Sequence, residues 1–281
     1  MILLQLIIFS KFEFNSNNLF IKNNISTFMN LDAWFSWYDK ILKEFGFSRE
    51  DDEKSAELLN NLLNEDNSSS IAETNIKDMV IIFGAGPSLK GNIEDLDELD
   101  QLEELNLNKF TLIAADGATT ALLEKDIVPD IIVTDLDGNM DDIIEANERG
   151  AILAVHAHGN NIDKIKEYVP ELKRILGTTQ SVPLENVSNF GGFTDGDRCI
   201  FLAIELGARF ILLAGMDFGD IVTKYSRPDL SEAEGKADEI KQMKLNYAKK
   251  LTQWAAENEN VKIVNMSGGE SVQGVDDIKF E

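Results

Sequence analysis

The segment PDIIVTDLDG, residues 129–138, concentrates carboxylates around a short apolar run. Asp135 and Asp137 follow that run two residues apart, and Asp116 ends another apolar run upstream. If strand geometry persists through the segment, side chains at i and i+2 point to one face. Like charges at one site are costly unless a cation neutralises them, and carboxylate oxygens suit Mg²⁺ together with substrate phosphates. We therefore predict that these three aspartates hold Mg²⁺ against a phosphorylated ligand.

Aspartates at strand ends also form turns and cap helices, so a structural alternative stands beside the metal site. Asp195, Asp197 and Asp217 share this position at predicted strand ends or helix starts. Thr194 and Asp197 have the spacing of a capping box with Asp in its fourth place. For Asp197 in particular, capping and ligand binding both remain open.

A glycine-rich turn, GAGPSL at 84–89, follows the first predicted strand of the α/β region. Gly84 and Gly86 would let the backbone approach a phosphate. Leu89 stands where a dinucleotide fingerprint needs its third glycine, and Lys90 is followed by Gly91, so the P-loop frame fails as well. The turn indicates either a phosphate site of another kind or an ordinary tight turn.

His156 and His158 are the only histidines, and they share a face if the strand continues through them. No third zinc ligand is obvious, so hydrogen bonds to substrate or phosphate, or a structural role, are expected. Arg198 lies near the start of a nearly all-apolar helix, where it would hold a phosphate or an acidic neighbour. The lysines of 236–250 form the main basic run, interpreted as a solvated face or as a contribution to triphosphate binding.

Short apolar runs alternate with helical patterns from residue 79 onward. Strands are predicted at 79–83, 110–115, 130–134, 151–156, 209–215 and 261–265, and helices at 118–125, 139–148, 160–168, 195–206 and 237–258. This alternation predicts a three-layer, Rossmann-like α/β fold with a mainly parallel sheet. Ligands bind beyond the carboxyl ends of such strands, which is where the unusual residues stand.

Three regions are expected along the chain. Residues 1–28 are predicted to be a non-native or disordered extension before a natural start at Met29, with a short membrane-associating segment as the alternative. Residues 29–66 contain two amphipathic helices, followed by the polar linker 64–74. The α/β catalytic domain spans 75–281.

The formal charge of −24 argues against nucleic acid or an anionic membrane as a partner. The single cysteine, Cys199, excludes an internal disulfide and a cysteine-based zinc cluster, and a buried position is expected for it. No apolar stretch is long enough to span a bilayer. A cytoplasmic location is expected, and a homodimer is left open.

Taken together, several motifs resemble the archaeal 6-hydroxymethyl-7,8-dihydropterin pyrophosphokinase family, which is related to the thiamine pyrophosphokinase catalytic domain. They are GAGPSL, AADGATTALLEKDIVPDIIVTDLDG, HAHG, NFGGFTDGDR and AGMDFG, at 84–89, 114–138, 156–159, 189–198 and 214–219. The resemblance covers about residues 30–281. It implies the fold of the thiamine pyrophosphokinase catalytic domain, preceded by the helical segment.

The resemblance implies transfer of pyrophosphate from ATP to the pterin hydroxymethyl oxygen, releasing AMP, in tetrahydromethanopterin or tetrahydrofolate synthesis. It implies Mg²⁺ as the metal and ATP and a reduced pterin as the ligands. The expected catalytic residues are Asp116, Asp135, Asp137 and Asp195. Nucleotide contacts are expected from Gly84, Gly86, Ser88, Gly117, Thr194, Asp197 and Arg198. Pterin contacts are expected from His156, His158, Asn160, Thr179, Phe193 and, with them, Phe190.

Three alternative functions are kept. A sugar-nucleotide glycosyltransferase is one, because the G-x-G-P-S-L turn also occurs in proteins of flagellin glycosylation. Thiamine pyrophosphokinase is the second, disfavoured because the last predicted strand leaves no room for the additional β-rich domain of those enzymes. A non-catalytic nucleotide-binding regulator is the third.

Overall fold

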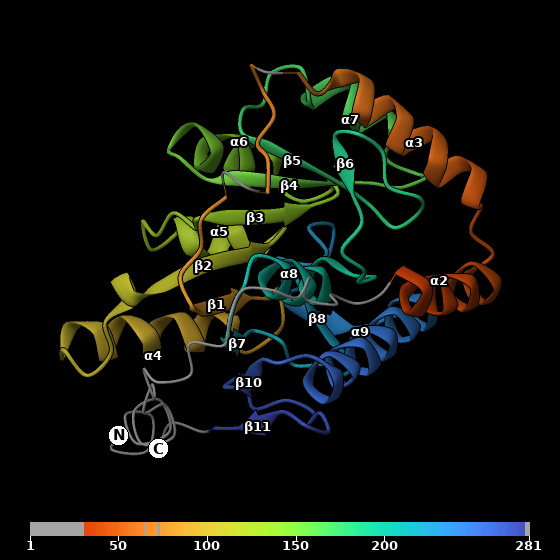
Figure 1. The fold of residues 1–281 in the computed structure, drawn as a ribbon. Coiled ribbons are helices and arrows are strands. Elements are labelled where there is room, and N and C mark those ends of the chain that lie inside the picture. Colours follow the sequence, from red (N-terminus) through yellow and green to blue (C-terminus); the bar gives the residue numbers. More distant parts are fainter. Residues whose placement is uncertain (1–30, 65, 72–73, 279–281) are drawn as a thin grey trace, which may run out of the picture.

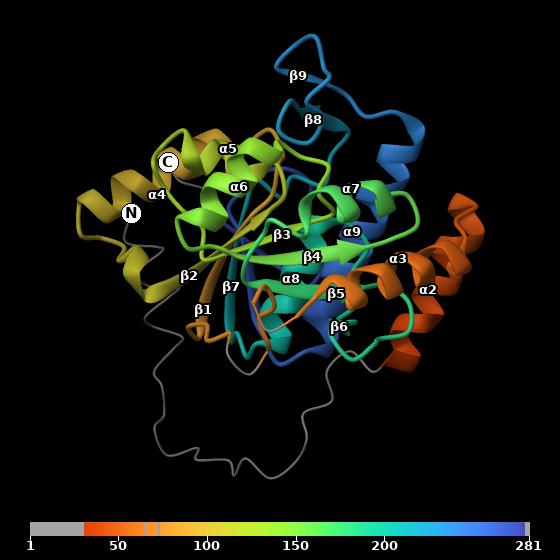
Figure 2. The same ribbon diagram turned by 90° about the horizontal axis from the view of Figure 1, so that it is seen from above.

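A nine-stranded parallel sheet runs through the centre of the protein (Figure 1). In the computed structural model the described residues are 31–64, 66–71 and 74–278. The strand order is β11-β10-β7-β1-β2-β3-β4-β5-β6. In chain order the strands are β1 (Met79–Phe83), β2 (Phe110–Ala115), β3 (Ile131–Thr134), β4 (Ile152–Ala157), β5 (Ile175–Thr179), β6 (Val187–Ser188), β7 (Phe210–Ala214), β10 (Lys262–Asn265) and β11 (Asp276–Asp277). A separate antiparallel pair, β8 (Ile221–Thr223) and β9 (Glu234–Lys236), stands out from the body of the domain (Figure 2).

Two helical layers cover the sheet, one on each face. Successive side chains of a strand point to opposite faces, so Ile81 and Phe83 of β1 join one core and Val80 and Ile82 join the other. The first core includes α3 (Arg49–Leu62), α4 (Leu89–Gln101), α5 (Ala118–Leu123), α6 (Met140–Glu148) and α7 (Ile162–Tyr168). The second includes α2 (Leu31–Phe45), α8 (Asp195–Glu205) and α9 (Glu239–Asn258). A short 3-10 helix, η1 (Leu107–Lys109), precedes β2.

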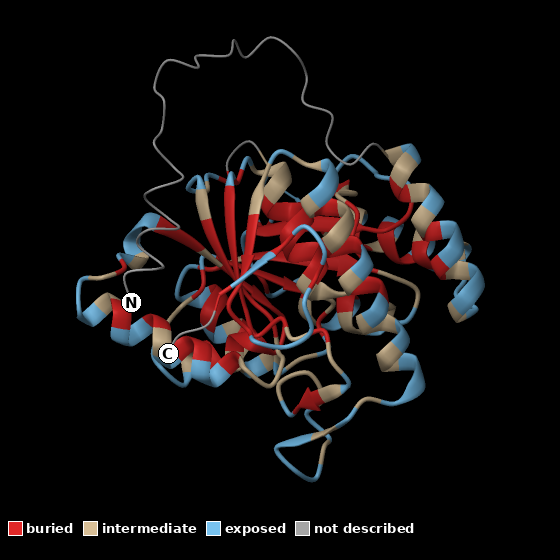
Figure 3. Ribbon diagram, turned by 90° about the horizontal axis from the view of Figure 1, so that it is seen from below, coloured by how far each residue is buried: buried red, intermediate tan, exposed pale blue. Residues whose placement is uncertain are grey.

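Burial on both faces explains why the strands read as apolar runs without alternation. Figure 3 shows the buried strands enclosed by helices whose outer sides are exposed. The three-layer α/β fold with a parallel sheet is therefore confirmed, and the six predicted strands are present with only small shifts at their ends. Cys199 is buried, as expected.

Several elements were not predicted, namely α4, β5, β6, β11 and the β8–β9 pair. β5 is interrupted in sequence by Gly177, a residue that weakens a strand pattern. The structure explains this glycine, because a Cβ there would lie 2.5 Å from the carbonyl oxygen of Asn186 beside β6. A tertiary contact therefore requires the glycine that makes β5 difficult to recognise from the sequence.

The two N-terminal helices belong to the same packed unit as the sheet. Trp34, Tyr38 and Ile41 of α2 are fully buried in the second core, and the buried side of α3 joins the first. The linker after α3 is also tied to the sheet, since Ser69 N–H donates to the carbonyl oxygen of Ile175 over 2.7 Å. The predicted extension at 1–28 lies outside the described residues. Within the described ranges, no helix combines the length and apolar character needed to cross a bilayer.

We predict that Trp34→Ala destabilises the protein by roughly 3–5 kcal/mol, because a fully buried indole is replaced by a cavity. The indole N–H, which donates to the Gln180 carbonyl oxygen over 2.8 Å, is lost as well. Urea unfolding followed by circular dichroism measures the change. Leu102→Ala is the matched control, since Leu102 is 55% exposed and should change stability little. Equal stability of the two variants would show that α2 is not part of the cooperative unit.

Candidate active site

A pocket of about 490 Å³ opens at the carboxyl edge of the sheet. It lies where the strand order reverses, with β1 between β2 and β7. Its walls come from the loops after β1, β2, β3, β4 and β7, from the start of α8 and from the first turns of α9. The α2–α3 connection, with Phe47 and Ser48, closes another side. A crevice at such a reversal is the expected ligand site of an open parallel sheet.

The carboxylates of Asp116, Asp135 and Asp137 meet in this pocket, with one oxygen of each within 4.8 Å of the others. β3 ends at Thr134, and Leu136 takes a left-handed conformation with φ +66°. A tight turn, rather than the strand alternation assumed from the sequence, therefore brings Asp135 and Asp137 together. Thr134 Oγ1 accepts the Leu136 N–H over 2.8 Å and donates to Asp116. One hydroxyl thus fixes both the turn and the third carboxylate.

Gly138 completes the geometry of this group. A Cβ at this position would lie 2.4 Å from Asp116 Oδ2, closer than real side chains approach. The Asp116 carboxylate occupies the space that the missing side chain leaves. The glycine in the D-L-D-G sequence is therefore required by the approach of a side chain from the neighbouring strand end.

Electrostatics in the group show how costly three close carboxylates are. Burial, with the charges of Asp135 and Asp137, raises the pKa of Asp116 to about 8. Burial and Asp135 raise the pKa of Asp137 to about 6. Burial also acts to raise the pKa of Asp135, but the hydrogen bond and charge of His158 outweigh it and leave this pKa below its usual range. The pKa of Asp195, beside the group, is raised well above normal by burial and by the three carboxylates.

A divalent cation fits this arrangement. The ligand atoms are all carboxylate oxygens, which hard cations such as Mg²⁺ prefer. Asp135 Oδ2 contacts His158 Nε2 at 2.9 Å, whereas Asp135 Oδ1 is buried and has no hydrogen-bond partner among the described residues. A metal ion held by Asp116, Asp135 and Asp137 would satisfy that oxygen and offset the repulsion.

We predict that the affinity for Mg²⁺ rises between pH 6 and pH 8, because the pKa of Asp137 is about 6 and that of Asp116 about 8 without metal. Below these values the carboxyl groups carry protons that the metal must displace, so binding weakens by up to about tenfold per pH unit for each proton released. Isothermal titration calorimetry in two buffers of different ionisation enthalpy counts the protons. An affinity that does not change over this range, with no proton release, would contradict the metal assignment.

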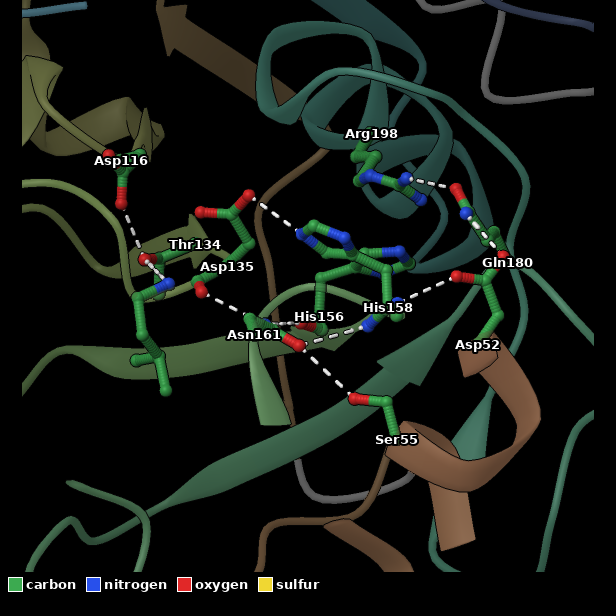
Figure 4. A network of polar contacts seen from close by, with 12 residues as sticks. Asp52, Ser55, Asp116, Thr134, Asp135, His156, His158, Asn161, Gln180 and Arg198 are labelled. Atoms are coloured by element: carbon green, nitrogen blue, oxygen red, sulfur yellow. Dashed lines mark hydrogen bonds and ion pairs between the residues drawn. The ribbon is translucent and has the colours of Figure 1, made fainter. Parts of the chain in front are cut away.

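A hydrogen-bond network holds the loop after β4 against the group (Figure 4). Asn161 Nδ2 donates to the carbonyl oxygens of Asp135 and His156 over 2.9 and 2.7 Å. Its Oδ1 accepts the His158 N–H and the Ser55 hydroxyl, both over 3.1 Å. Asn161 therefore links the end of β3, the end of β4 and the helix α3.

Another part of the pocket wall is organised by Asp52 of α3. Asp52 Oδ2 accepts hydrogen bonds from the Tyr38 hydroxyl and from Gln180 Nε2 over 2.6 and 2.7 Å, and Oδ1 accepts the Gly159 N–H over 2.8 Å. Gln180 Oε1 in turn accepts from Arg198 Nη2 over 2.9 Å. Neither Asp52 nor Gln180 was predicted as a site residue. Asp52 lies in an acidic first turn that is ordinary for a helix, so its sequence gave no signal.

Most residues predicted for the site do line the pocket. They are Gly84, Gly86, Asp116, Gly117, Asp135, Asp137, His156, His158, Asn160, Phe193, Thr194, Asp195 and Arg198. The structure therefore brings the quoted motifs to one place. Ser88, Thr179, Phe190 and Asp197 do not line it.

The exceptions have structural roles. Asp197 is fully buried and forms the capping box with Thr194, accepting the Phe193 and Thr194 N–H groups over 2.6 and 2.8 Å. The cap thus uses this carboxylate, and a contact with nucleotide stays a prediction. Ser88 donates through both N–H and hydroxyl to Asp217 Oδ2, and Thr179 Oγ1 pairs with Ser181 Oγ at 3.2 Å. These side chains therefore hold the loops in this structure, and a ligand contact for them stays a prediction.

The glycine-rich turn after β1 packs against the loop after β7. Gly84 N–H donates to the Ala214 carbonyl oxygen over 2.8 Å and Gly86 N–H to that of Gly215 over 2.9 Å. A Cβ on Gly86 would lie 2.1 Å from Asp217 Oδ2, so close packing of the two loops requires the glycine. With these N–H groups used inside the protein, a phosphate-binding role for the turn stays a prediction.

Two lysines of α9 reach the acidic pocket. Apart from Arg198, Lys241 and Lys244 are the Lys and Arg residues among the described residues that line it. Lys241 is half-buried and forms no ion pair in the part of the chain that the structure describes. Burial lowers its pKa, and the charges of Asp195 and Asp137 oppose that effect. Lys244 Nζ lies 5.8 Å from the ring centroid of Phe193.

Comparisons with known proteins identify the family of the chain. The family model described as "6-hydroxymethylpterin diphosphokinase MptE-like" matches residues 54–223. A 6-hydroxymethyl-7,8-dihydropterin pyrophosphokinase from Methanothermobacter thermautotrophicus is 51% identical over 236 residues, covering 84% of this chain and 99% of that protein. The protein of the same name from Methanocaldococcus jannaschii is 48% identical over 233 residues, covering 79% and 94%.

Among solved structures, the MAf glycosyltransferase from Magnetospirillum magneticum AMB-1 is similar, with a TM-score of 0.52 and 16% sequence identity. The match covers 83% of this chain and 38% of the glycosyltransferase. At this identity the likeness concerns the fold alone. The family model and the archaeal relatives confirm the resemblance found in the motifs, and the chain belongs to the 6-hydroxymethylpterin diphosphokinase MptE-like family.

Proposed function

We propose that the protein transfers a pyrophosphoryl group from ATP to the hydroxymethyl oxygen of 6-hydroxymethyl-7,8-dihydropterin, in a Mg²⁺-dependent reaction. The products are the pterin diphosphate and AMP, and the pathway is tetrahydromethanopterin or tetrahydrofolate synthesis. The observation that carries the proposal is the group of Asp116, Asp135 and Asp137 within 4.8 Å, at the strand-order reversal of a chain from this family. The names of the relatives supply the acceptor.

The lining of the pocket offers groups that suit both substrates. The three aspartates and Lys241 combine a metal site with an unpaired ammonium group and would bind the phosphates. His156, Arg198 and Phe193 also line the pocket and offer polar atoms and an aromatic wall to a flat heterocycle. Mg²⁺ held by the aspartates would neutralise phosphate charge and orient the phosphates.

Catalysis in this arrangement consists of positioning. The pterin hydroxymethyl oxygen forms a bond to the β-phosphorus of ATP, and the bond from that phosphorus to the α,β-bridging oxygen breaks. AMP leaves with the bridging oxygen, and the hydroxyl proton passes to water. Phosphoryl transfer of this kind depends mainly on alignment and charge stabilisation. The capped start of α8 contributes its positive dipole end at Thr194.

The assay that tests this proposal follows nucleotide products with ATP, Mg²⁺ and either 6-hydroxymethyl-7,8-dihydropterin or thiamine. We expect AMP only with the pterin, and a loss of roughly 100-fold or more in turnover for Asp137→Asn, because a metal ligand and its charge are removed. Asp141→Asn is the matched control, since Asp141 lies on α6 and does not line the pocket. AMP formed with thiamine would identify thiamine as the acceptor. The absence of acceptor-dependent turnover would favour the glycosyltransferase or regulator alternative.

We further predict that Lys241→Met weakens ATP binding roughly 10- to 100-fold, because a charge-assisted contact with phosphate is lost. Lys249→Met, on the same helix, is the control, since Lys249 Nζ pairs with Glu270 at 2.8 Å and does not line the pocket. Titration calorimetry with ATP and with inorganic tripolyphosphate measures the effect without any acceptor. Equal affinities for the two variants would place the phosphates away from α9.

A further inference from the structure

One buried nitrogen in the pocket has no hydrogen-bond partner in the protein. Among the described residues, the buried side-chain atoms without a partner are Thr119 Oγ1, Asp135 Oδ1 and His156 Nε2. Asp135 and His156 line the pocket, and the metal site accounts for the Asp135 oxygen. His156 is only 1% exposed, so water does not readily satisfy its Nε2 atom. A buried polar atom without a hydrogen-bond partner is costly. Its position beside a pocket therefore indicates that a ligand atom supplies the partner.

The hydrogen bonds around His156 fix its tautomer. Thr178 Oγ1 donates its single proton to the Val155 carbonyl oxygen over 3.1 Å. The contact between His156 Nδ1 and Thr178 Oγ1, at 3.1 Å, must therefore use the Nδ1–H as donor. Burial, followed by the charge of Arg198, lowers the pKa of His156 well below its usual value and keeps the ring neutral. Nε2 consequently presents a lone pair and acts as an acceptor.

Arg198 supplies a donor next to this acceptor. Figure 4 shows the two imidazole rings between Asp135 on one side and Arg198 and Gln180 on the other. The hydrogen bonds of Arg198 within the described structure, to Gln180 Oε1 and the Phe193 carbonyl oxygen, both come from Nη2. N–H groups on its other guanidinium nitrogens remain for a ligand. Asp52 and Gln180 are less suited to bind a ligand, because their polar atoms already form hydrogen bonds to each other and to Tyr38, Gly159 and Arg198.

We propose that His156 Nε2 and the Arg198 guanidinium recognise a cyclic lactam edge, in which a ring N–H stands beside a carbonyl oxygen. This inference rests on the proposed function, because the pterin ring carries such an edge at N3–H and O4. The N3–H donates to His156 Nε2, and O4 accepts from Arg198. The pair thereby sets the orientation of the ring and rejects heterocycles in which donor and acceptor are exchanged.

The first test compares two ligands on the unaltered protein by fluorescence titration. 6-Hydroxymethylpterin carries the lactam edge, whereas 2,4-diamino-6-hydroxymethylpteridine has an acceptor at N3 and a donor at C4. We expect the diamino compound to bind at least roughly 100-fold more weakly, as sites built for a buried polar edge discriminate strongly. Similar affinities would overturn the inference and leave the proposed function standing. Failure of both compounds to bind would overturn the proposed function itself.

The second test uses variants of His156. His156→Gln retains an acceptor near the position of Nε2, whereas His156→Leu removes it. We expect pterin affinity to fall roughly 10- to 100-fold in His156→Leu and less in His156→Gln, with ATP affinity unchanged in both. Equal pterin binding by the two variants and the unaltered protein would contradict the assignment.

The tautomer itself can be measured in the unaltered protein. Because the chain has two histidines, ¹⁵N NMR of its imidazoles is readily assigned with the aid of a His158 variant. We expect a protonated Nδ1 and an unprotonated Nε2 for His156 before the pterin is added. A protonated Nε2 would overturn the acceptor role regardless of how the variants fold.

Discussion

Repulsion among three closely spaced carboxylates is the constraint on which the rest of the site depends. The sheet places the ends of β2 and β3 side by side, and with them Asp116, Asp135 and Asp137. The protein holds them there with a left-handed turn at Leu136, a threonine hydroxyl and a glycine that leaves room for Asp116. Raised pKa values for Asp116 and Asp137 show that the protein alone does not neutralise the charge. A cation and a phosphate-bearing ligand would complete such a site.

The N-terminal helices complete the pocket from outside the sheet. α2 and α3 pack on opposite faces, and their connection supplies Phe47 and Ser48 to the pocket wall. Asp52 then joins α2, the loop after β4 and the segment after β5 through Tyr38, Gly159 and Gln180. Because this carboxylate is saturated with donors, it stabilises the position of Gln180 and, through it, Arg198. The helices therefore serve the site as well as the core.

Two unsatisfied buried atoms lie in the lining of the same pocket. Asp135 Oδ1 lies in the carboxylate group and His156 Nε2 lies beneath the loop after β4, and both are buried. In a fold whose other buried polar side chains are largely bonded, such atoms indicate where ligands contribute the missing partners. A metal held by the carboxylates and a heterocycle held at His156 would together align the reacting atoms of a pyrophosphoryl transfer.

The sequence by itself determined six of the nine strands of the main sheet, the edge at which the motifs lie and the family, because apolar runs and strand-end residues are local signals. It placed Asp116, Asp135, Asp137, His156 and Arg198 in one site. It did not separate Asp197 or Ser88 from ligand-binding residues, because a helix cap and a loop contact use the same side chains as a ligand site. Asp52 and Gln180 carry no local signal at all, since their roles arise from contacts with residues far away along the chain. The turn at Leu136 and the tautomer of His156 were likewise decided by tertiary structure, because each depends on a hydroxyl, from Thr134 or Thr178, that has only one proton to donate.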